Sequence, residues 1–253
     1  MFVHGFACDH TDWQPQIDAM RDSHRCLRVD LRGHGHSADL GAPYDMQTLA
    51  ADVVEAMRAN HITSAVLVGH SMGTRVVAEA LRAAPDLVRG LVFVDGSQLG
   101  HGDPDEARAT INKIIDNLGY DHVMQVNFAA MCGETTAPAL RDAIVQRASE
   151  LPERIGRALW NEMVGYDAAH MAEAYAGIRA PLLVLQSSTV ETGGQRRALK
   201  PGETNTPFLE MLTQLVPHAQ LVLAPGIGHF IQLDAPDLVS QTVRDFAAQV
   251  FTA

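Results

Sequence analysis

Short runs of apolar residues alternate with longer amphipathic stretches along this 253-residue chain. Apolar runs that read as buried strands lie at 25–31, 64–70, 90–96, 181–187 and 219–226, and a further run, Phe-Val-His-Gly, opens the chain at residue 2. Continuous apolar runs are typical of parallel strands that are covered on both faces. Helical periodicity occurs between them, at 46–60, 73–85 and 235–251. This alternation predicts an α/β fold with a mostly parallel central sheet, helices on both faces and right-handed crossovers.

Residues 100–178 depart from this alternation. They contain no strand-like run, but helical patterns recur at 105–119, 121–131, 138–150 and 153–164. We expect a core made of residues 1–99 and 179–253, with an inserted helical cap, or lid, at 100–178. The simpler alternative is a run of helices packed on the sheet. A long loop is predicted at 188–206 from four turn-forming residues, Gly193, Gly194, Pro201 and Gly202.

Local signals define some ends of these elements. Asp45 is a candidate N-cap for the helix at 46–60, and Pro85 marks the end of the helix at 73–85. The strand at residue 2 leaves no room for the strands that commonly precede such a segment. Either the protein dispenses with them or its natural start lies upstream.

Composition narrows the function classes. The formal net charge is −11, and no run of lysine or arginine is long enough to follow a phosphate backbone, so we expect no nucleic-acid partner. No apolar run is long enough to span a bilayer, and no signal peptide is visible at the N-terminus. Three cysteines without Cys-x-x-Cys spacing fit free thiols in a reducing compartment. We expect a soluble, cytoplasmic protein of unknown oligomeric state.

One segment, Val-Leu-Val-Gly-His-Ser-Met-Gly-Thr-Arg-Val-Val at 66–77, joins a predicted strand to a predicted helix. A sharp turn here would hold Ser71 in a strained backbone conformation, which requires tiny neighbours and explains Gly69 and Gly73. The turn presents the hydroxyl at the carboxyl end of the sheet, and the next helix points its N-terminal N–H groups toward it. Ser71 is therefore a candidate nucleophile; the alternative is a glycine-bracketed turn with an incidental serine.

At this point the chain resembles the α/β-hydrolase superfamily over nearly its whole length. Three further segments match in the right order. His-Gly-Phe at 4–6 resembles the oxyanion loop, Asp-Leu-Arg-Gly-His-Gly-His-Ser at 30–37 resembles the signature after the next strand, and Pro-Gly-Ile-Gly-His-Phe at 225–230 resembles the segment with the catalytic histidine. The resemblance implies the α/β-hydrolase fold, with an inserted helical cap.

The resemblance also implies roles for individual residues. His229 lies on a glycine-flanked loop after a strand and would act as general base and acid toward Ser71. Backbone N–H groups of Phe6 and Met72 would form the oxyanion hole. His4, His10, His70 and Trp160 are candidates for substrate contacts, although His4 could instead support the loop and His10 could lie on the surface.

The triad acid is the position where this chain departs from the common pattern. The family usually places it after the strand at 181–187, but the chain continues there without aspartate and offers only Glu191. A minority of the family uses an acid after the preceding strand, where Asp95 follows Ser71 by one strand–helix–strand crossover. We therefore favour Asp95, with Glu191 as the alternative. Either carboxylate could orient the imidazole.

A serine, histidine and acid with an oxyanion hole attack carbonyl carbon. We expect hydrolysis of a carboxylic ester or lactone of an apolar or aromatic small molecule through an acyl-enzyme. The alternatives are carbon–carbon bond hydrolysis of a diketone and cofactor-independent dioxygenation of a quinolone-type N-heteroaromatic substrate. A further alternative is a non-catalytic relative. His34 and His36 lack zinc-site spacing and are expected to be structural, so we expect no metal. The sequence has no phosphate-binding loop, so we expect no cofactor.

Overall fold

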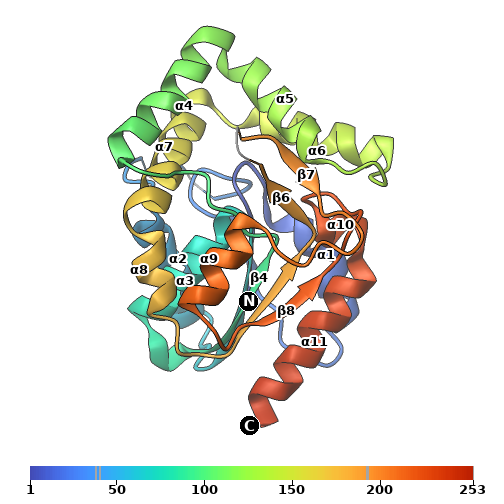
Figure 1. The fold of residues 1–253 in the computed structure, drawn as a ribbon. Coiled ribbons are helices and arrows are strands. Elements are labelled where there is room, and N and C mark those ends of the chain that lie inside the picture. Colours follow the sequence, from blue (N-terminus) through green and yellow to red (C-terminus); the bar gives the residue numbers. More distant parts are fainter. Residues whose placement is uncertain (38, 40, 192–193, 253) are drawn as a thin grey trace.

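A six-stranded parallel sheet forms the centre of the molecule (Figure 1). The computed structural model describes residues 1–37, 39, 41–191 and 194–252. The strands lie in the order β2-β1-β3-β4-β5-β8, and each neighbouring pair runs parallel. Their bounds are β1 (Phe2–Val3), β2 (Arg28–Val29), β3 (Ala65–His70), β4 (Val88–Val94), β5 (Leu182–Gln186) and β8 (Gln220–Leu223). The predicted parallel α/β architecture is confirmed.

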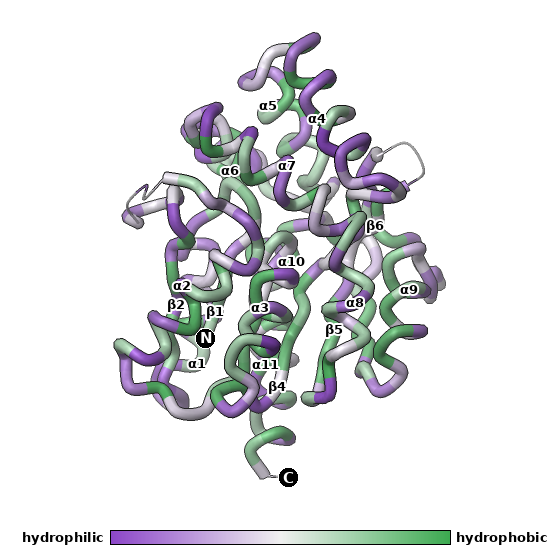
Figure 2. The backbone as a smooth tube through the Cα atoms, turned by 90° about the vertical axis from the view of Figure 1, so that its left-hand side faces the viewer, coloured by the Kyte–Doolittle hydropathy of each residue, from purple (hydrophilic) through white to green (hydrophobic). Residues whose placement is uncertain are grey.

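Alternate residues of the central strands enter different halves of the core. Val66 and Val68 of β3 pack in one cluster with α1 (Gln14–Met20) and α11 (Pro236–Thr252). Leu67 packs in the other cluster, with α2 (Met46–Ala59) and α3 (Met72–Ala83). Because helices cover both faces, side chains that point either way must be apolar, and the strands read as continuous apolar runs. Figure 2 shows this apolar colouring along β4 and β5.

The ends of two helices follow the local signals. The Asp45 carboxylate accepts a hydrogen bond from the N–H of Thr48 at 2.7 Å, so it caps α2 as predicted. Helix α3 ends at Ala83, and Pro85 begins a single 3-10 turn, Pro85–Leu87. A side-chain cap at a helix start contributes on the order of 1 kcal/mol.

Five helices lie between β4 and β5. They are α4 (Pro104–Leu118), α5 (Tyr120–Met131), α6 (Pro138–Glu150), α7 (Glu153–Ala169) and α8 (Met171–Ala176). We call residues 100–178 the helical insertion. Helix α4 packs against α7, and α5 packs against α6. The pairs lie at the top of Figure 1, at one end of the sheet. Within the described residues, no helix is long and apolar enough to cross a membrane.

The prediction of a plain loop at 188–206 is wrong. This segment contains an antiparallel hairpin of β6 (Ser188–Val190) and β7 (Arg196–Ala198), although Gly193 lies outside the described residues. Apolar patterning could not reveal it, because the buried members of the hairpin are polar, among them Ser188 and Arg196. Short helical elements also went unpredicted: the 3-10 turn His10–Trp13, α1, α8, α9 (Pro207–Leu215) and α10 (Ile231–Asp234).

Candidate active site

Ser71 occupies a strained turn between β3 and α3. Its φ of 54° and ψ of −114° lie in a region that non-glycine residues avoid, at a cost of roughly 1–3 kcal/mol. The turn needs glycine on both sides. A Cβ on Gly69 would lie 2.3 Å from the carbonyl oxygen of Gly73, and a Cβ on Gly73 would lie 2.6 Å from that of Val3. The predicted mechanical role of these two glycines is thus borne out by the backbone geometry.

The turn is held in place by the groups around it. The N–H of Ser71 donates to the carbonyl of Val94 at 3.1 Å. Its own carbonyl accepts from the Thr74 hydroxyl at 2.7 Å and from the Arg75 guanidinium at 3.1 Å. Arg75 is fully buried and makes a bidentate ion pair with Asp167 of α7, both contacts at 2.6 Å. The helical insertion is therefore tied directly to the serine turn.

The Asp95 carboxylate at the end of β4 accepts a hydrogen bond from Nδ1 of His229 at 2.5 Å. Asp95 is fully buried and also accepts from the N–H groups of Ser187 and Ser188, at 2.8 and 2.7 Å, and from both of their hydroxyls. Burial would raise the pKa of Asp95, but the hydrogen bond from His229 and the nearby charges hold this pKa well below its usual range. Asp95 is therefore ionised at neutral pH.

His229 is buried beside this carboxylate. Burial, with the positive charge of Arg196 as a second cause, lowers the pKa of His229 to about 4, and Asp95 opposes the shift. The imidazole is thus neutral at pH 7 and able to accept a proton. Ser71 and His229 line the same pocket, and no hydrogen bond joins their side chains in the described part of the chain. Catalytic hydrogen bonds are often long before substrate binds.

The loop at 4–7 lies directly against the serine turn. A Cβ on Gly5 would lie 3.0 Å from the Cβ of Ser71. Among the described residues, no acceptor is assigned to the backbone N–H of Phe6 or of Met72. Two such donors beside a nucleophile fit an oxyanion hole.

Two buried histidines fix the shape of this loop. Nε2 of His4 accepts from the N–H of Leu31 at 2.9 Å, and its Nδ1 donates to the Gly5 carbonyl at 2.7 Å. Nε2 of His34 accepts from the N–H of Ala7 at 3.2 Å. Burial lowers the pKa of His4 to about 3 and that of His34 to about 4, so both stay neutral acceptors. His4 supports the loop and does not line the pocket.

A small pocket of about 20 Å³ lies over Ser71. Its remaining lining residues are Phe6, Cys8, His70, Leu99, Asn127, Phe128, Met131, Trp160, Met163, Arg196, His229 and Phe230. Trp160 and His70, both proposed from sequence as substrate contacts, thus face this space. Nε2 of His70 donates to the His229 carbonyl at 3.0 Å, and burial keeps the pKa of His70 well below its ordinary value.

Comparison with known families is consistent with this geometry. A model of the alpha/beta hydrolase family matches residues 1–242. The chain belongs to the alpha/beta hydrolase family. Among its relatives, 2-(acetamidomethylene)succinate hydrolase of Mesorhizobium japonicum is 25% identical over 247 residues, or 97% of this chain and 86% of that protein. The pimeloyl-(acyl-carrier protein) methyl ester esterase of Yersinia enterocolitica is 26% identical over 255 residues, or 98% and 93%.

A solved structure shares the fold of this alpha/beta hydrolase. It is Est816, described as an N-acyl homoserine lactone degrading enzyme. The two structures superpose with a TM-score of 0.79 at 21% identity, covering 97% of this chain and 91% of the other. At this identity the likeness supports the fold alone.

Glu191, the alternative acid of this hydrolase, lies on the surface after β6. Its carboxylate pairs with the Arg197 guanidinium at 2.5 Å. The carboxylate that contacts His229 in the described structure is that of Asp95. An acid at the end of β4 reaches the histidine because β4 lies beside β3 and its serine turn.

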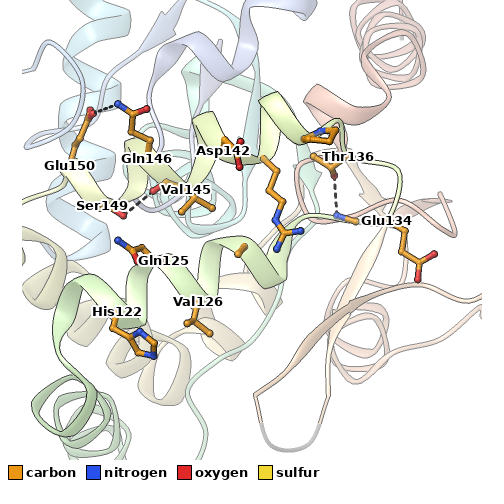
Figure 3. Close-up of a pocket in the computed structure, with 14 residues that line it drawn as sticks. His122, Gln125, Val126, Glu134, Thr136, Asp142, Val145, Gln146, Ser149 and Glu150 are labelled. Carbon is orange, nitrogen blue, oxygen red and sulfur yellow. Dashed lines mark hydrogen bonds between the residues drawn. The ribbon is translucent and has the colours of Figure 1, made fainter.

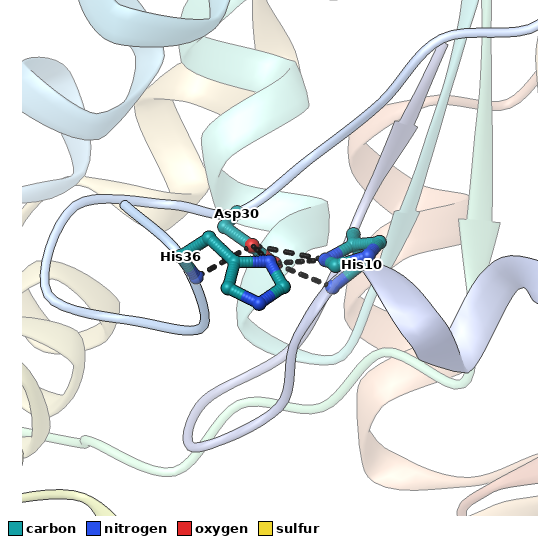
Figure 4. A group of neighbouring side chains, drawn as sticks. All are labelled: His10, Asp30 and His36. Carbon is teal, nitrogen blue, oxygen red and sulfur yellow. Dashed lines mark hydrogen bonds and ion pairs between the residues drawn. The ribbon is translucent and has the colours of Figure 1, made fainter. Parts of the chain in front are cut away.

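His10 lies outside the pocket, bound to Asp30 (Figure 4). Its backbone N–H and its Nδ1 donate to the Asp30 carboxylate at 2.7 and 2.8 Å, and the backbone N–H of His36 donates at 2.8 Å. Ligand atoms of these three residues lie within 4.8 Å of one another, so within the described residues this is the group that could hold a metal ion. Both Asp30 oxygens already accept hydrogen bonds, which tie the two loops together.

A larger hollow, of about 990 Å³, lies between α5 and α6 on the helical insertion (Figure 3). Most of its lining residues are polar or charged, including His122, Glu134 and Asp142. The candidate nucleophile, base and acid do not line it. The candidate catalytic residues Ser71 and His229 line the small pocket instead.

Sequence reasoning missed two buried arginines, Arg75 and Arg196. The signal for Arg75 was a basic residue directly before two valines, Val76 and Val77, in the helix that follows the serine. Arg196 gave no signal, because it lies in a run that reads as a polar loop.

Proposed function

We propose that this alpha/beta hydrolase cleaves carboxylic esters or lactones through an acyl-enzyme on Ser71. The observation that carries the proposal is the 2.5 Å contact between Asp95 and His229 beside the strained Ser71 turn. A neutral, oriented imidazole that lines the same pocket as a serine hydroxyl is the arrangement that activates serine as a nucleophile. The resemblance to esterases supports the same reaction class.

The proposed reaction has two halves. His229 takes the Ser71 proton while Oγ forms a bond to the carbonyl carbon, and the N–H groups of Phe6 and Met72 stabilise the oxyanion. The carbon–oxygen bond to the alcohol then breaks, and His229 returns the proton to that leaving oxygen. Water, deprotonated by His229, attacks the acyl-enzyme and releases the acid and free Ser71. Asp95 stabilises the imidazolium in both halves.

We propose that the helical insertion works as the cap. Helix α5 contributes Asn127, Phe128 and Met131 to the pocket, and α7 contributes Trp160 and Met163. A space of about 20 Å³ holds little more than one water molecule. Substrate entry therefore requires these helices to move, as lids do in many enzymes. The apolar lining favours an apolar body for the substrate.

Labelling with a fluorophosphonate probe tests the nucleophile. The wild type should be labelled at Ser71, and Ser71→Ala should not be labelled. Hydrolysis of a panel of p-nitrophenyl esters and lactones should fall by at least about 10³-fold in Ser71→Ala. If Ser71→Ala only slowed turnover, and oxygen were consumed in the presence of a quinolone-type substrate, the dioxygenase alternative would be favoured. Serine is not the nucleophile in that chemistry.

A further inference from the structure

Arg196 is a buried cation in the wall of the pocket. It is the first residue of β7, is 8% exposed, and shares the pocket lining with Ser71 and His229. Strand β7 contacts α5, so the arginine lies where the hairpin meets the helical insertion. A charge taken out of water is costly unless its partners satisfy it. The hydrogen bonds and the counter-ion of Arg196 therefore decide whether its charge is satisfied within the protein or is left to bind a ligand.

The partners of Arg196 leave it incompletely satisfied. Its guanidinium donates to the hydroxyls of Ser188 at 2.8 Å and Ser97 at 3.0 Å, and to Asp95 at 3.3 Å. These are three of the five N–H bonds of an arginine. These bonds come from the two terminal nitrogens, and Nε has no acceptor among the described residues. The side chain lines the pocket beside Ser71 and His229.

The negative charge next to Arg196 is already shared. Asp95 accepts five other hydrogen bonds, from His229, Ser187 and Ser188, and its contact with Arg196 is the longest of the set. The other buried arginine nearby, Arg75, makes two contacts of 2.6 Å with its counter-ion Asp167. Arg196 is therefore only weakly paired with its counter-ion.

Among the described residues that line the pocket, Arg196 is the one that carries a charge at neutral pH. Burial lowers the pKa of His70 and His229, so both are neutral, and burial raises the pKa of Cys8, so it stays a thiol. The other lining residues are apolar or carry uncharged polar groups. A single desolvated cation in an apolar pocket selects for one negative charge in its ligand.

The next residue gives a natural contrast. Side chains alternate along a strand, so Arg197 points away from the pocket. Arg197 is partly exposed and is neutralised by Glu191 and Glu203 at 2.5 and 2.8 Å. The hairpin therefore carries one satisfied arginine outward and one incompletely satisfied arginine inward.

We propose that Arg196 binds a carboxylate on the acyl part of the substrate, so that the preferred substrates are half-esters or lactones with a second, free carboxylate. This inference rests on the proposed ester or lactone hydrolysis. The free edge of the guanidinium at Nε fits a carboxylate oxygen, and an arginine fork can hold both oxygens. Arg196 contacts Asp95, which in turn contacts His229, so the bound carboxylate would lie on the His229 side of Ser71.

Two methyl esters with four-carbon acyl chains test this preference. Monomethyl succinate carries a carboxylate where methyl butyrate carries a methyl group, and hydrolysis of both can be followed by acid release. In the wild type, kcat/KM should be at least tenfold higher for monomethyl succinate. Arg196→Gln should reduce that ratio by about 10- to 100-fold, the worth of a hydrogen bond to a charged group. Arg196→Lys should give an intermediate ratio.

The ratio separates substrate binding from support of Asp95. Loss of the contact to Asp95 slows both esters alike and cancels in the ratio. Arg197→Gln is the matched control, because it removes the neighbouring guanidinium and should leave the ratio unchanged. An unchanged ratio in Arg196→Gln would overturn the proposal and leave Arg196 as a support for the acid alone.

A binding measurement keeps the inference separate from the reaction. Calorimetry on Ser71→Ala should show monomethyl succinate binding at least tenfold more tightly than methyl butyrate, and Ser71→Ala with Arg196→Gln should lose the preference. If the wild type hydrolysed neither ester but this preference held, the proposed function would fail and the carboxylate site would stand. If hydrolysis occurred without any preference in rate or binding, the reverse would hold.

Discussion

Two buried arginine–aspartate pairs lie around the serine turn, and they differ in how well each is satisfied. Arg75 and Asp167 make two contacts of 2.6 Å, and Arg75 also reaches the carbonyl groups of Ser71 and Ser97. Arg196 and Asp95 make one contact of 3.3 Å. Burial lowers the pKa of both arginines, but Asp167 outweighs it for Arg75, whose pKa is raised, whereas the pKa of Arg196 stays lowered.

The difference separates a pair that is satisfied within the fold from a pair to which we assign a function. A buried pair whose members satisfy each other has nothing left to offer a ligand, and breaking it leaves a bare charge in the interior. Arg75 and Asp167 fit that description, since Asp167 also accepts from the N–H of Leu99 at 2.7 Å. In the second pair, the contact of Asp95 with His229 is short, at 2.5 Å, and its contact with Arg196 is long, at 3.3 Å. We therefore assign the negative charge of Asp95 to the candidate base and the positive charge of Arg196 to the proposed substrate carboxylate.

The largest expected effect comes from the carboxylate of the second pair. Asp95→Asn keeps the shape but removes the charge that orients His229 and stabilises its protonated form. We expect kcat to fall by about 10³- to 10⁴-fold. Ester hydrolysis by the purified variant measures the loss, and circular dichroism checks that the fold is kept.

Glu191→Gln is the matched control for this change. Glu191 is exposed and bound to Arg197, and exposed ion pairs contribute about 0–1 kcal/mol. Its loss should alter kcat less than twofold. Near-normal turnover in Asp95→Asn together with a collapse in Glu191→Gln would show that the acid has been assigned to the wrong strand end.

The next largest effect is on stability and concerns the first pair. Arg75→Met leaves the Asp167 carboxylate buried without its counter-ion, which should cost about 3–5 kcal/mol. For a chain of this size, Tm should fall by about 2–4 °C per kcal/mol. Arg196→Met should cost less, because Asp95 keeps its other hydrogen bonds. Calorimetry compares the two variants directly.

A double variant sharpens this test. Arg75→Met with Asp167→Leu removes both charges and should recover part of the stability lost in Arg75→Met. Equal losses of Tm in Arg75→Met and Arg196→Met would erase the distinction between a satisfied and an incompletely satisfied pair.

Much of the frame was predictable from local sequence. The strands were found because covered parallel strands are apolar on both faces, and the serine turn was found because its crossing backbones exclude any Cβ at Gly69 and Gly73. Asp95 was reachable by the same logic, since one crossover from Ser71 leads to the adjacent strand end. These features are predictable because they depend on residues close in sequence or on a single strand–helix–strand crossover.

The rest depended on tertiary neighbours that no local pattern encodes. Arg196 was assigned to a loop, because a buried polar strand around an acid lacks the apolar alternation that marks strands. His10 was proposed to face substrate, but the aspartate that binds it comes from a different loop. The partner of Arg75 lies on α7, far along the chain. Charged groups reveal their roles only when their counter-ions are known.

The smallest effect is a shift in pH dependence, and it tests whether the charge of Arg196 reaches the base. His229 must be neutral to accept a proton, so kcat/KM should hold as pH falls toward 5 and drop near its pKa of about 4. Burial is the main cause of that low pKa and Arg196 the second, so Arg196→Gln should raise it and move the acid limb to higher pH. Arg197→Gln should leave the limb in place. Because the folded pKa of His229 lies below its ordinary 6.5, the folded state also loses stability as pH falls from 6.5 toward 4, and the fold must be monitored at each pH. If the limbs of both variants coincided with the wild type, the charge of Arg196 would not act on His229, and the second pair would be as self-contained as the first.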